Sequence, residues 1–223
     1  MRPDSEIWDW PVAANALRQL LPALWTTAWI TVVAAVGAMI LGVVWAVLRL
    51  AKIPVVSQLV VLIVEFLRGT PALVQLYFLF YVLPMYGLTI DAVTTGIMGL
   101  AIYTSSYCSE VYRAGIAAIP QGQWEAARML GLSQAQTWLR VVLPQAWRLV
   151  IPPLGNYVLL MFKETTLLSA ITVVELANQA SDFGSATFRY TEGYTVAAAL
   201  YFVIIFPTSR MLRRFERMTF VAR

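Results

Sequence analysis

Five long apolar segments dominate this sequence and decide which solvent the chain can fold in. They lie at about residues 23–48, 55–83, 93–112, 150–176 and 195–211. Of the 223 residues, 60% are hydrophobic and 13% are charged, whereas soluble domains have about 45–50% apolar and about 25% charged residues. Because a helix needs about 20 apolar residues to cross a bilayer, the segments predict an all-α integral membrane protein with about five transmembrane helices.

The basic residues predict how these helices are oriented. Eleven of the 16 lysines and arginines lie in the loops 49–53 and 113–149 or after residue 209. Arg2, Arg18 and Arg189 lie on the opposite side. Positive residues favour the cytoplasmic side of a membrane. We therefore predict that the N-terminus is outside and the C-terminus inside, which agrees with an odd number of spans.

The second apolar segment is interrupted between Gly69 and Pro71. Proline removes a backbone donor and clashes with the preceding turn, so a kink or break is expected there. Glu65 and Arg68 are three residues apart and are expected to form an ion pair that steadies this turn; a gate or a translocation path is the alternative role. Gln75 would share a face with Arg68 on such a path only if the helix were unbroken.

Three further charges fall within or near the fourth apolar segment. A charge at the bilayer centre costs about 2.5–3.5 kcal/mol, so such residues usually face a cavity or a partner. Glu164 and Glu175 are eleven residues apart, about three helical turns, and are expected to lie on one face. This face, with Lys163 beside it, is the first candidate for a translocation path. The alternatives are an interface with another membrane subunit, or a position of Glu175 at the outer surface.

A stripe of polar and aromatic residues runs along the third apolar segment. Tyr103, Ser106, Tyr107 and Glu110 recur at helical spacing. Aromatic faces and a carboxylate could meet a zwitterionic or cationic substrate there, which makes Tyr107 a candidate path residue. Small and hydroxylated residues also pack membrane helices together, and packing is the alternative interpretation.

The longest predicted cytoplasmic segment, at about 120–145, has the pattern of a helix, a sharp turn and a second helix. Gly131 suits the left-handed position just past a helix end. Ser133 with Gln136 three residues later forms a capping box for the second helix. Three prolines further on are expected to limit how far the second helix runs, namely Pro144, Pro152 and Pro153. A compact helical hairpin at the membrane surface is suited to docking a soluble partner.

This segment resembles the "EAA" signature of permease subunits of bacterial ABC importers. The residues that match it with the expected spacing are Glu125, Ala126, Ala127, Gly131, Val141, Leu143 and Pro144. The resemblance implies a type I importer permease, with 1–223 as a single transmembrane domain in the bacterial inner membrane. It also implies that the segment carries a coupling helix for an ATPase, in which Glu125, Ala126, Ala127, Arg128 and Gly131 are the expected coupling residues.

Other motifs resemble a narrower subgroup, the permeases for polar amino acids of the histidine, arginine, glutamine and opine type. They are the runs 65–76, 110–116, 144–146, 152–156 and 163–171. Within that subgroup, the runs 162–165 and 122–124 look most like ectoine and hydroxyectoine permeases. The resemblance implies import of a polar amino acid or an amino-acid-derived compatible solute by alternating access.

The energy source is expected on another polypeptide. A nucleotide-binding P-loop needs Gly-x4-Gly-Lys-Ser/Thr, and neither Lys52 nor Lys163 can complete that motif. We therefore expect no cofactor on this chain, ATP and magnesium on a partner, and no enzyme activity. With no histidine and one cysteine, a transition-metal site is not expected.

The resemblance also implies the partners. They are two ATPase subunits, a second permease subunit that is either a homologue or a copy of this chain, and an extracytoplasmic solute-binding protein, with no nucleic acid. The alternative function is a self-sufficient channel or ion-coupled transporter that relays ions through Glu164, Glu175 and Lys163.

Overall fold

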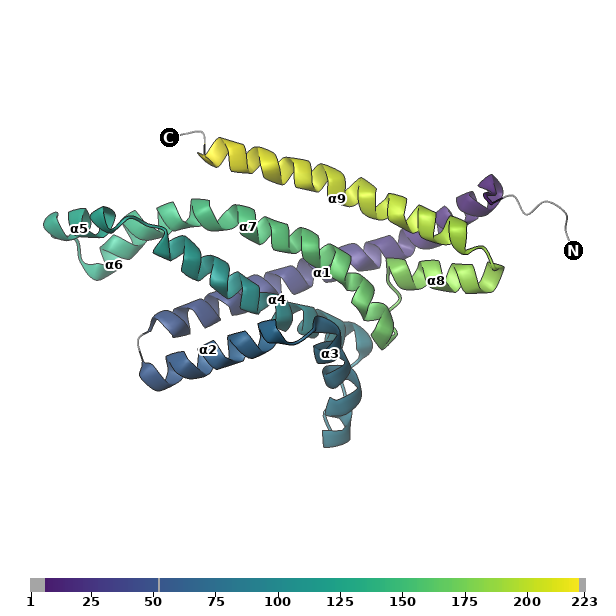
Figure 1. Ribbon diagram of the computed structural model, residues 1–223, viewed down its shortest axis with the longest axis horizontal. Helices are drawn as coiled ribbons and strands as arrows, with labels where there is room; N and C mark the ends of the chain where they lie inside the picture. Colours follow the sequence, from purple (N-terminus) through teal and green to yellow (C-terminus); the bar gives the residue numbers. More distant parts are fainter. Residues whose placement is uncertain (1–6, 52, 221–223) are drawn as a thin grey trace, which may run out of the picture. The chain divides into compact units, whose positions relative to one another are not determined.

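The computed structural model describes residues 7–51 and 53–220, and within these residues the regular elements are all helical (Figure 1). Short π-helical and 3₁₀ turns join or extend several of the helices. The α-helices are α1 (Trp10–Leu50), α2 (Pro54–Gly69), α3 (Ala72–Tyr77), α4 (Ala92–Ala117), α5 (Gln121–Met129), α6 (Gln134–Thr137), α7 (Leu143–Glu164), α8 (Leu176–Thr187) and α9 (Tyr190–Phe220).

The helices are long and apolar enough to cross a membrane several times. Helix α1 and the part of α9 from Tyr190 to Arg214 each meet this requirement alone. Two broken pairs meet it when each pair is counted as one span: Pro54–Gly69 with Ala72–Tyr86, and Gln134–Ile171 with α8. Helix α4 has 26 residues and is long enough, although hydroxylated residues interrupt its apolar pattern. The helices thus supply about four to five spans, in agreement with the predicted number of about five.

The predicted interruption near Pro71 is present. Helix α2 ends at Gly69, and Thr70 is extended, with φ −108° and ψ 140°. The backbone N–H of Thr70 still donates to the carbonyl oxygen of Phe66 at 3.1 Å. A residue before proline is pushed out of the helical region, and Pro71 has no N–H to continue the ladder. These two local effects end the helix here, and α3 begins one residue later.

The prediction that prolines would limit the helix after Ser133 is wrong. Helix α7 runs from Leu143 to Glu164 with Pro152 and Pro153 inside it. Pro144 follows a π-helical turn at Trp138–Val142, in which the N–H of Leu143 donates to the carbonyl oxygen of Trp138. This wider turn precedes the proline, so the helix continues past it. Membrane helices tolerate internal proline because neighbouring groups satisfy the freed backbone.

The second π-helical turn of the described chain has the same position relative to a proline. It covers Phe78–Val82, and the N–H of Leu83 donates to the carbonyl oxygen of Phe78 just before Pro84. In both cases the residue that closes the π-helical turn directly precedes a proline, which has no backbone N–H to donate.

Contacts divide the chain into two compact units. Among the described residues, unit 1 comprises the chain up to Ala34 with 72–100 and 159–209. Unit 2 comprises 35–71, 101–158 and the chain from Arg210.

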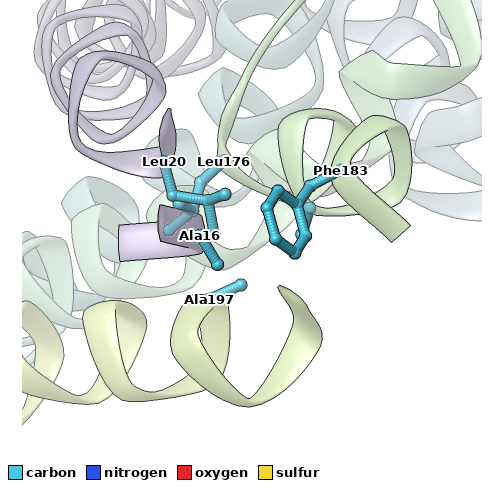
Figure 2. Packing of buried hydrophobic residues seen from close by; sticks show 6 residues of the cluster. Ala16, Leu20, Leu176, Phe183 and Ala197 are labelled. Atoms are coloured by element: carbon cyan, nitrogen blue, oxygen red, sulfur yellow. The ribbon is translucent and has the colours of Figure 1, made fainter. Parts of the chain in front are cut away.

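Unit 1 has a core formed by α1, α8 and the start of α9. Figure 2 shows the ring of Phe183 from α8 near small side chains of the two other helices. The buried members of this core are Ala16, Leu20, Leu176, Ala180, Phe183 and Ala197. Three of the six are alanines, and small residues of this kind let membrane helices approach closely.

In unit 2 the second half of α1 packs closely on α4. A methyl group added at Gly42 would lie 2.6 Å from the Cβ of Cys108, so only glycine fits there. The indole N–H of Trp45 donates to the hydroxyl of Ser105 at 3.0 Å. Further along, Arg49 forms an ion pair with Glu110. These contacts fix the end of α4 that leads into α5.

Candidate functional site

The predicted cytoplasmic segment folds as a helical hairpin of α5 and α6 with a tight turn between them (Figure 1). Helix α5 ends at Met129, and Gly131 has φ +69°. The N–H of Gly131 donates to Arg128 O at 3.0 Å, and the N–H of Leu132 donates to Ala127 O at 3.1 Å. This pair of bonds is the Schellman motif, which needs a left-handed residue. The predicted left-handed position of Gly131 just past the helix end is therefore confirmed.

The second half of the hairpin begins with the predicted capping box. The hydroxyl of Ser133 accepts from the N–H of Gln136 at 3.3 Å. The N–H of Ser133 donates to the side-chain oxygen of Gln136 at 3.0 Å. Two backbone N–H donors at the start of α6 are thus satisfied within four residues, which confirms the capping prediction.

The hairpin rests on its own small core. The rings of Trp124 and Trp138 meet edge to face, with centroids 5.4 Å apart. Both indoles pack against a cluster of Ile119, Val142 and Ala146. This packing holds the hairpin to the residues just after α4 and to the start of α7.

The surface of the hairpin combines charge with exposed apolar side chains. Glu125, Ala126 and Arg128 are exposed, and the side chains next to the turn, Met129 and Leu130, are 88% and 78% exposed. Exposed apolar groups rimmed by charge are typical of protein interaction sites. Ala127, which the signature places among the coupling residues, is buried, so its side chain packs the hairpin rather than extending this surface.

The ion pair beside the helix break joins an aromatic cluster in unit 2. The carboxylate of Glu65 lies 3.5 Å from the guanidinium of Arg68, near Gly69. The same guanidinium lies 5.4 Å from the ring centroid of Tyr107, a distance at which a cation is attracted to an aromatic face. The ring of Tyr107 also meets that of Tyr157, with centroids 5.6 Å apart. Two candidate path residues, Arg68 and Tyr107, are therefore neighbours.

Glu110, at the end of the predicted polar stripe, is engaged within the chain. Its carboxylate pairs with Arg49 of α1 and with Arg113 of α4, the latter at 2.9 Å. Two guanidinium groups thus neutralise one carboxylate, and this arrangement favours the packing interpretation of Glu110. Tyr103 and Tyr107, in the same stripe, have hydroxyl oxygens 3.2 Å apart.

The prediction that Glu164 and Glu175 share a helix face is wrong. Helix α7 ends at Glu164, a 3₁₀ turn covers Thr165–Ile171, and Thr172 is left-handed, with φ +65°. Glu175 then starts α8 as its N-cap. A left-handed residue between the two carboxylates destroys the helical register on which the prediction depended.

Glu175 has a structural role in unit 1. It is fully buried, and its two carboxylate oxygens accept from the backbone N–H groups of Asn178 at 2.6 Å and Ala177 at 2.9 Å. The hydroxyl of Tyr201 donates to it at 3.2 Å. A carboxylate at an N-cap satisfies helix donors and complements the helix dipole. The argument from a shared helix face no longer applies to Glu175, and its assignment to a translocation path stays a prediction.

The remaining candidate path residues lie in unit 1. Lys163 is exposed and Glu164 is half-buried at the end of α7. Gln75 is half-buried in α3. Their assignment to a translocation path stays a prediction.

Comparison with known proteins identifies the chain. The family model described as "Binding-protein-dependent transport system inner membrane component" matches residues 38–221. The chain belongs to this family. It is therefore a multi-pass inner membrane permease, a transport component rather than a catalytic subunit, and the predicted fold class and location are confirmed.

Relatives of the permease match it over almost their whole lengths. A probable amino-acid ABC transporter permease protein, y4tG, of Sinorhizobium fredii is 41% identical over 90% of this chain and 87% of its own. The L-cystine transport system permease protein TcyB of Bacillus subtilis is 33% identical over 94% and 90%. A crystal structure of an amino acid ABC transporter with histidines has a chain that is 36% identical, covers 95% of this permease and 99% of itself, and has a TM-score of 0.90.

Family membership also bears on the partners and on the alternative function. A binding-protein-dependent ABC system implies an ATPase and a binding protein as partners of this permease. A self-sufficient ion-coupled transporter has no need of a binding protein, so the family does not support that alternative.

Two structural features of the permease escape sequence reasoning. The pairing of Arg49 with Glu110 joins residues 61 positions apart, and no local spacing rule relates them. The contact of Tyr157 with Tyr107 joins α7 to α4 in the same way. Charged residues and tyrosines in apolar segments can be recognised in the sequence as candidates for polar contacts. Which of them contact one another is seen only in the folded structure.

Proposed function

We propose that this permease imports a polar amino acid, or a compatible solute derived from one, by alternating access. In this proposal two ATPase subunits bind the complex from the cytoplasm, and a second permease subunit, a copy or a homologue, completes the path. An extracytoplasmic binding protein delivers the solute. The observation that carries the proposal is the exposed tip of the α5–α6 hairpin, in the segment that matches the coupling signature.

The hairpin has the physical properties that mechanical coupling needs. Its turn is fixed by a Schellman motif and its second helix by a capping box. Its base is held by the two packed indoles of Trp124 and Trp138. A rigid element with an exposed apolar tip transmits the movement of a docked partner instead of deforming locally.

The substrate class is supported by the relatives. One is described as a permease for amino acids, one as a permease for L-cystine, and the similar solved structure is of an amino acid transporter. All of these solutes are zwitterions. The motifs at 162–165 and 122–124 that look like ectoine permeases place ectoine and hydroxyectoine among the solutes to test.

The proposal is tested by reconstituting the permease with its ATPase and its binding protein in vesicles. Uptake of labelled amino acids, with ectoine and hydroxyectoine as competitors, identifies the solute. We expect uptake to need ATP, the ATPase and the binding protein together. Flux of the same solute through vesicles that contain this chain alone would contradict the proposal and favour the ion-coupled alternative.

The docking role is tested in the same vesicles by reversing one charge. Glu125→Lys changes the exposed face of α5 and is expected to abolish uptake while the protein stays in the membrane. Asp182→Lys makes the same change at an exposed position of α8 and is expected to leave uptake near normal. Equal effects of the two substitutions would argue against docking through α5.

A further inference from the structure

We propose that unit 2 holds a binding site for one anionic phospholipid at the base of the hairpin. This inference does not depend on which solute the permease imports. Two cavities meet there, one of about 710 Å³ and one of about 850 Å³. Both volumes lie in the range of about 300–1,000 Å³ that is typical of small-molecule sites. Leu50, Ile116 and Trp138 line both cavities, so the two spaces are neighbours across the same three side chains.

The smaller cavity offers hydrogen-bond donors. Arg128 lines it together with Gln121, Gln134 and Thr137. The Nε of Arg128 already donates to Trp124 O at 3.3 Å, and the hydroxyl of Thr137 donates to Ser133 O at 3.0 Å. The donors that can face a ligand are therefore the terminal N–H groups of the guanidinium and the amides of the two glutamines. Charge-assisted hydrogen bonds from arginine to phosphate oxygens are strong and often bidentate. This half of the site therefore suits a phosphate group.

The larger cavity is lined almost entirely by apolar side chains from α1, α4 and the start of α7. Val47 is 58% exposed and Trp147 is 60% exposed, and both belong to this lining together with Val43, Leu143, Pro144 and Ala146. Exposed aliphatic and indole groups in a membrane protein need an apolar neighbour. An acyl chain supplies such a neighbour along the length of the groove.

The adjacency of the two halves favours a phospholipid over another helix. A phospholipid places a charged phosphate directly beside its acyl chains, and the two cavities place donors directly beside an apolar groove. The predicted orientation puts this region on the cytoplasmic side, where anionic lipids attract basic residues. Trp138 and Trp147 also suit the headgroup level, where indoles are enriched.

Lipid at this position would touch the supports of the hairpin. Trp138 and Ile116, which line both cavities, also pack against the hairpin's core of Ile119, Val142 and Ala146. An occupied groove would thus hold the base of the hairpin from the membrane side. We expect an anionic lipid to raise the thermal unfolding midpoint of the purified permease.

The test is native mass spectrometry of the full chain in neutral detergent, titrated with phosphatidylglycerol or phosphatidylcholine. Val47→Trp and, separately, Val43→Trp narrow the apolar groove. Val203→Trp is the matched control, because Val203 on α9 is 65% exposed and lines neither cavity. We expect the unchanged permease to retain one phosphatidylglycerol with about tenfold preference over phosphatidylcholine. Each groove variant should lose this adduct, and Val203→Trp should keep it.

A separate variant tests the half of the site that would bind the phosphate headgroup. Arg128→Gln should remove the preference for phosphatidylglycerol, whatever it does to transport. Equal retention of both lipids by the unchanged permease would overturn the proposal, as would normal lipid binding by both groove variants. Equal loss in Val203→Trp would show a general lipid shell and overturn it too. So would cross-linking of Val47→Cys to a neighbouring subunit in the assembled importer with no lipid retained.

Discussion

Arg49 at the end of α1 and Glu110 on α4 form an ion pair across 61 positions of sequence. Their side chains are only 14% and 21% exposed, and Glu110 is also held by Arg113. In solvent exposure the pair is therefore intermediate between two classes of salt bridge. A surface salt bridge contributes about 0–1 kcal/mol to stability, and disruption of a buried one costs about 3–5 kcal/mol. The Arg49–Glu110 pair ties α1 to α4, the helix that leads into the α5–α6 hairpin.

A double-mutant cycle is expected to show this coupling. Glu110→Gln should lower the thermal unfolding midpoint in detergent more than Arg49→Gln, because Glu110 holds two guanidinium groups and Arg49 one carboxylate. The double variant should be hardly less stable than Glu110→Gln, since the interaction is already lost. Additive losses would mean that the two residues do not interact.

The second prediction concerns Glu175, which the structure makes a helix cap. Glu175→Ala removes the acceptor for the N–H groups of Ala177 and Asn178. We expect a loss of about 0.5–2 kcal/mol of stability, the usual cost of losing an N-cap. Glu175→Gln keeps one acceptor and should lose less. The measurement is the thermal unfolding midpoint of both variants beside their uptake rates.

A helix cap and a translocation-path residue at Glu175 predict different combinations of stability and uptake. If it is only a cap, Glu175→Gln retains transport in proportion to the protein that stays folded. If the Glu175→Gln variant has normal stability but no uptake, the carboxylate takes part in translocation.

Local rules predict much of the fold and nearly all of the hairpin. Pro71, Gly131 and Ser133 act on residues at most four positions away, so the break, the turn and the cap follow from spacing alone. The long apolar runs likewise predict helices that cross a membrane, because hydropathy needs no knowledge of neighbours.

The parts that escape prediction depend on contacts between distant residues. Helix α8 is not foreseen, since its start depends on a left-handed Thr172 and on Glu175, whose carboxylate is also held by Tyr201 of α9. The continuation of α7 past Pro144 requires a π-helical turn, and no residue type in the sequence predicts such a turn. The cluster of Arg68 with Tyr107 forms only when α2 packs near α4.

The third prediction is a dependence of stability on pH at the start of α4. The carboxylate of Asp91 accepts from the N–H of Thr94 at 3.0 Å. Hydrogen bonding by the side chain of Thr94, together with this backbone bond, holds the pKa of Asp91 below its ordinary value of 3.8. Because the pKa is lower in the folded state, the cap stabilises the fold above the ordinary value. That contribution disappears as the pH falls through the lower, folded value.

Asp91→Asn isolates this contribution from other carboxylates. Asparagine also caps a helix but does not titrate. We expect the unfolding midpoint of the unchanged permease to fall more steeply than that of the variant between about pH 5 and about pH 3. Parallel curves in this range would show that the cap does not depend on the charge of Asp91.

The last prediction concerns the turn of the hairpin. Gly131 has φ +69°, and a residue with a Cβ pays about 1–2 kcal/mol in that conformation. A β-branched residue fits it worst, so Gly131→Val should displace the tip that carries Met129 and Leu130. We expect uptake and ATPase stimulation by the loaded binding protein to be lost together, while the amount of permease in the membrane stays near normal. Gly131→Asn, which tolerates a left-handed backbone, should retain most activity.

Gly122 provides the matched control for this turn. It lies on α5 in the same hairpin, its φ is not positive, and a methyl group added there meets no atom within 4 Å. Gly122→Val should therefore leave uptake largely intact. If Gly131→Val transports normally, the hairpin's shape does not matter for coupling. If Gly122→Val is as inactive as Gly131→Val, the loss comes from the surface of α5 and not from the left-handed turn.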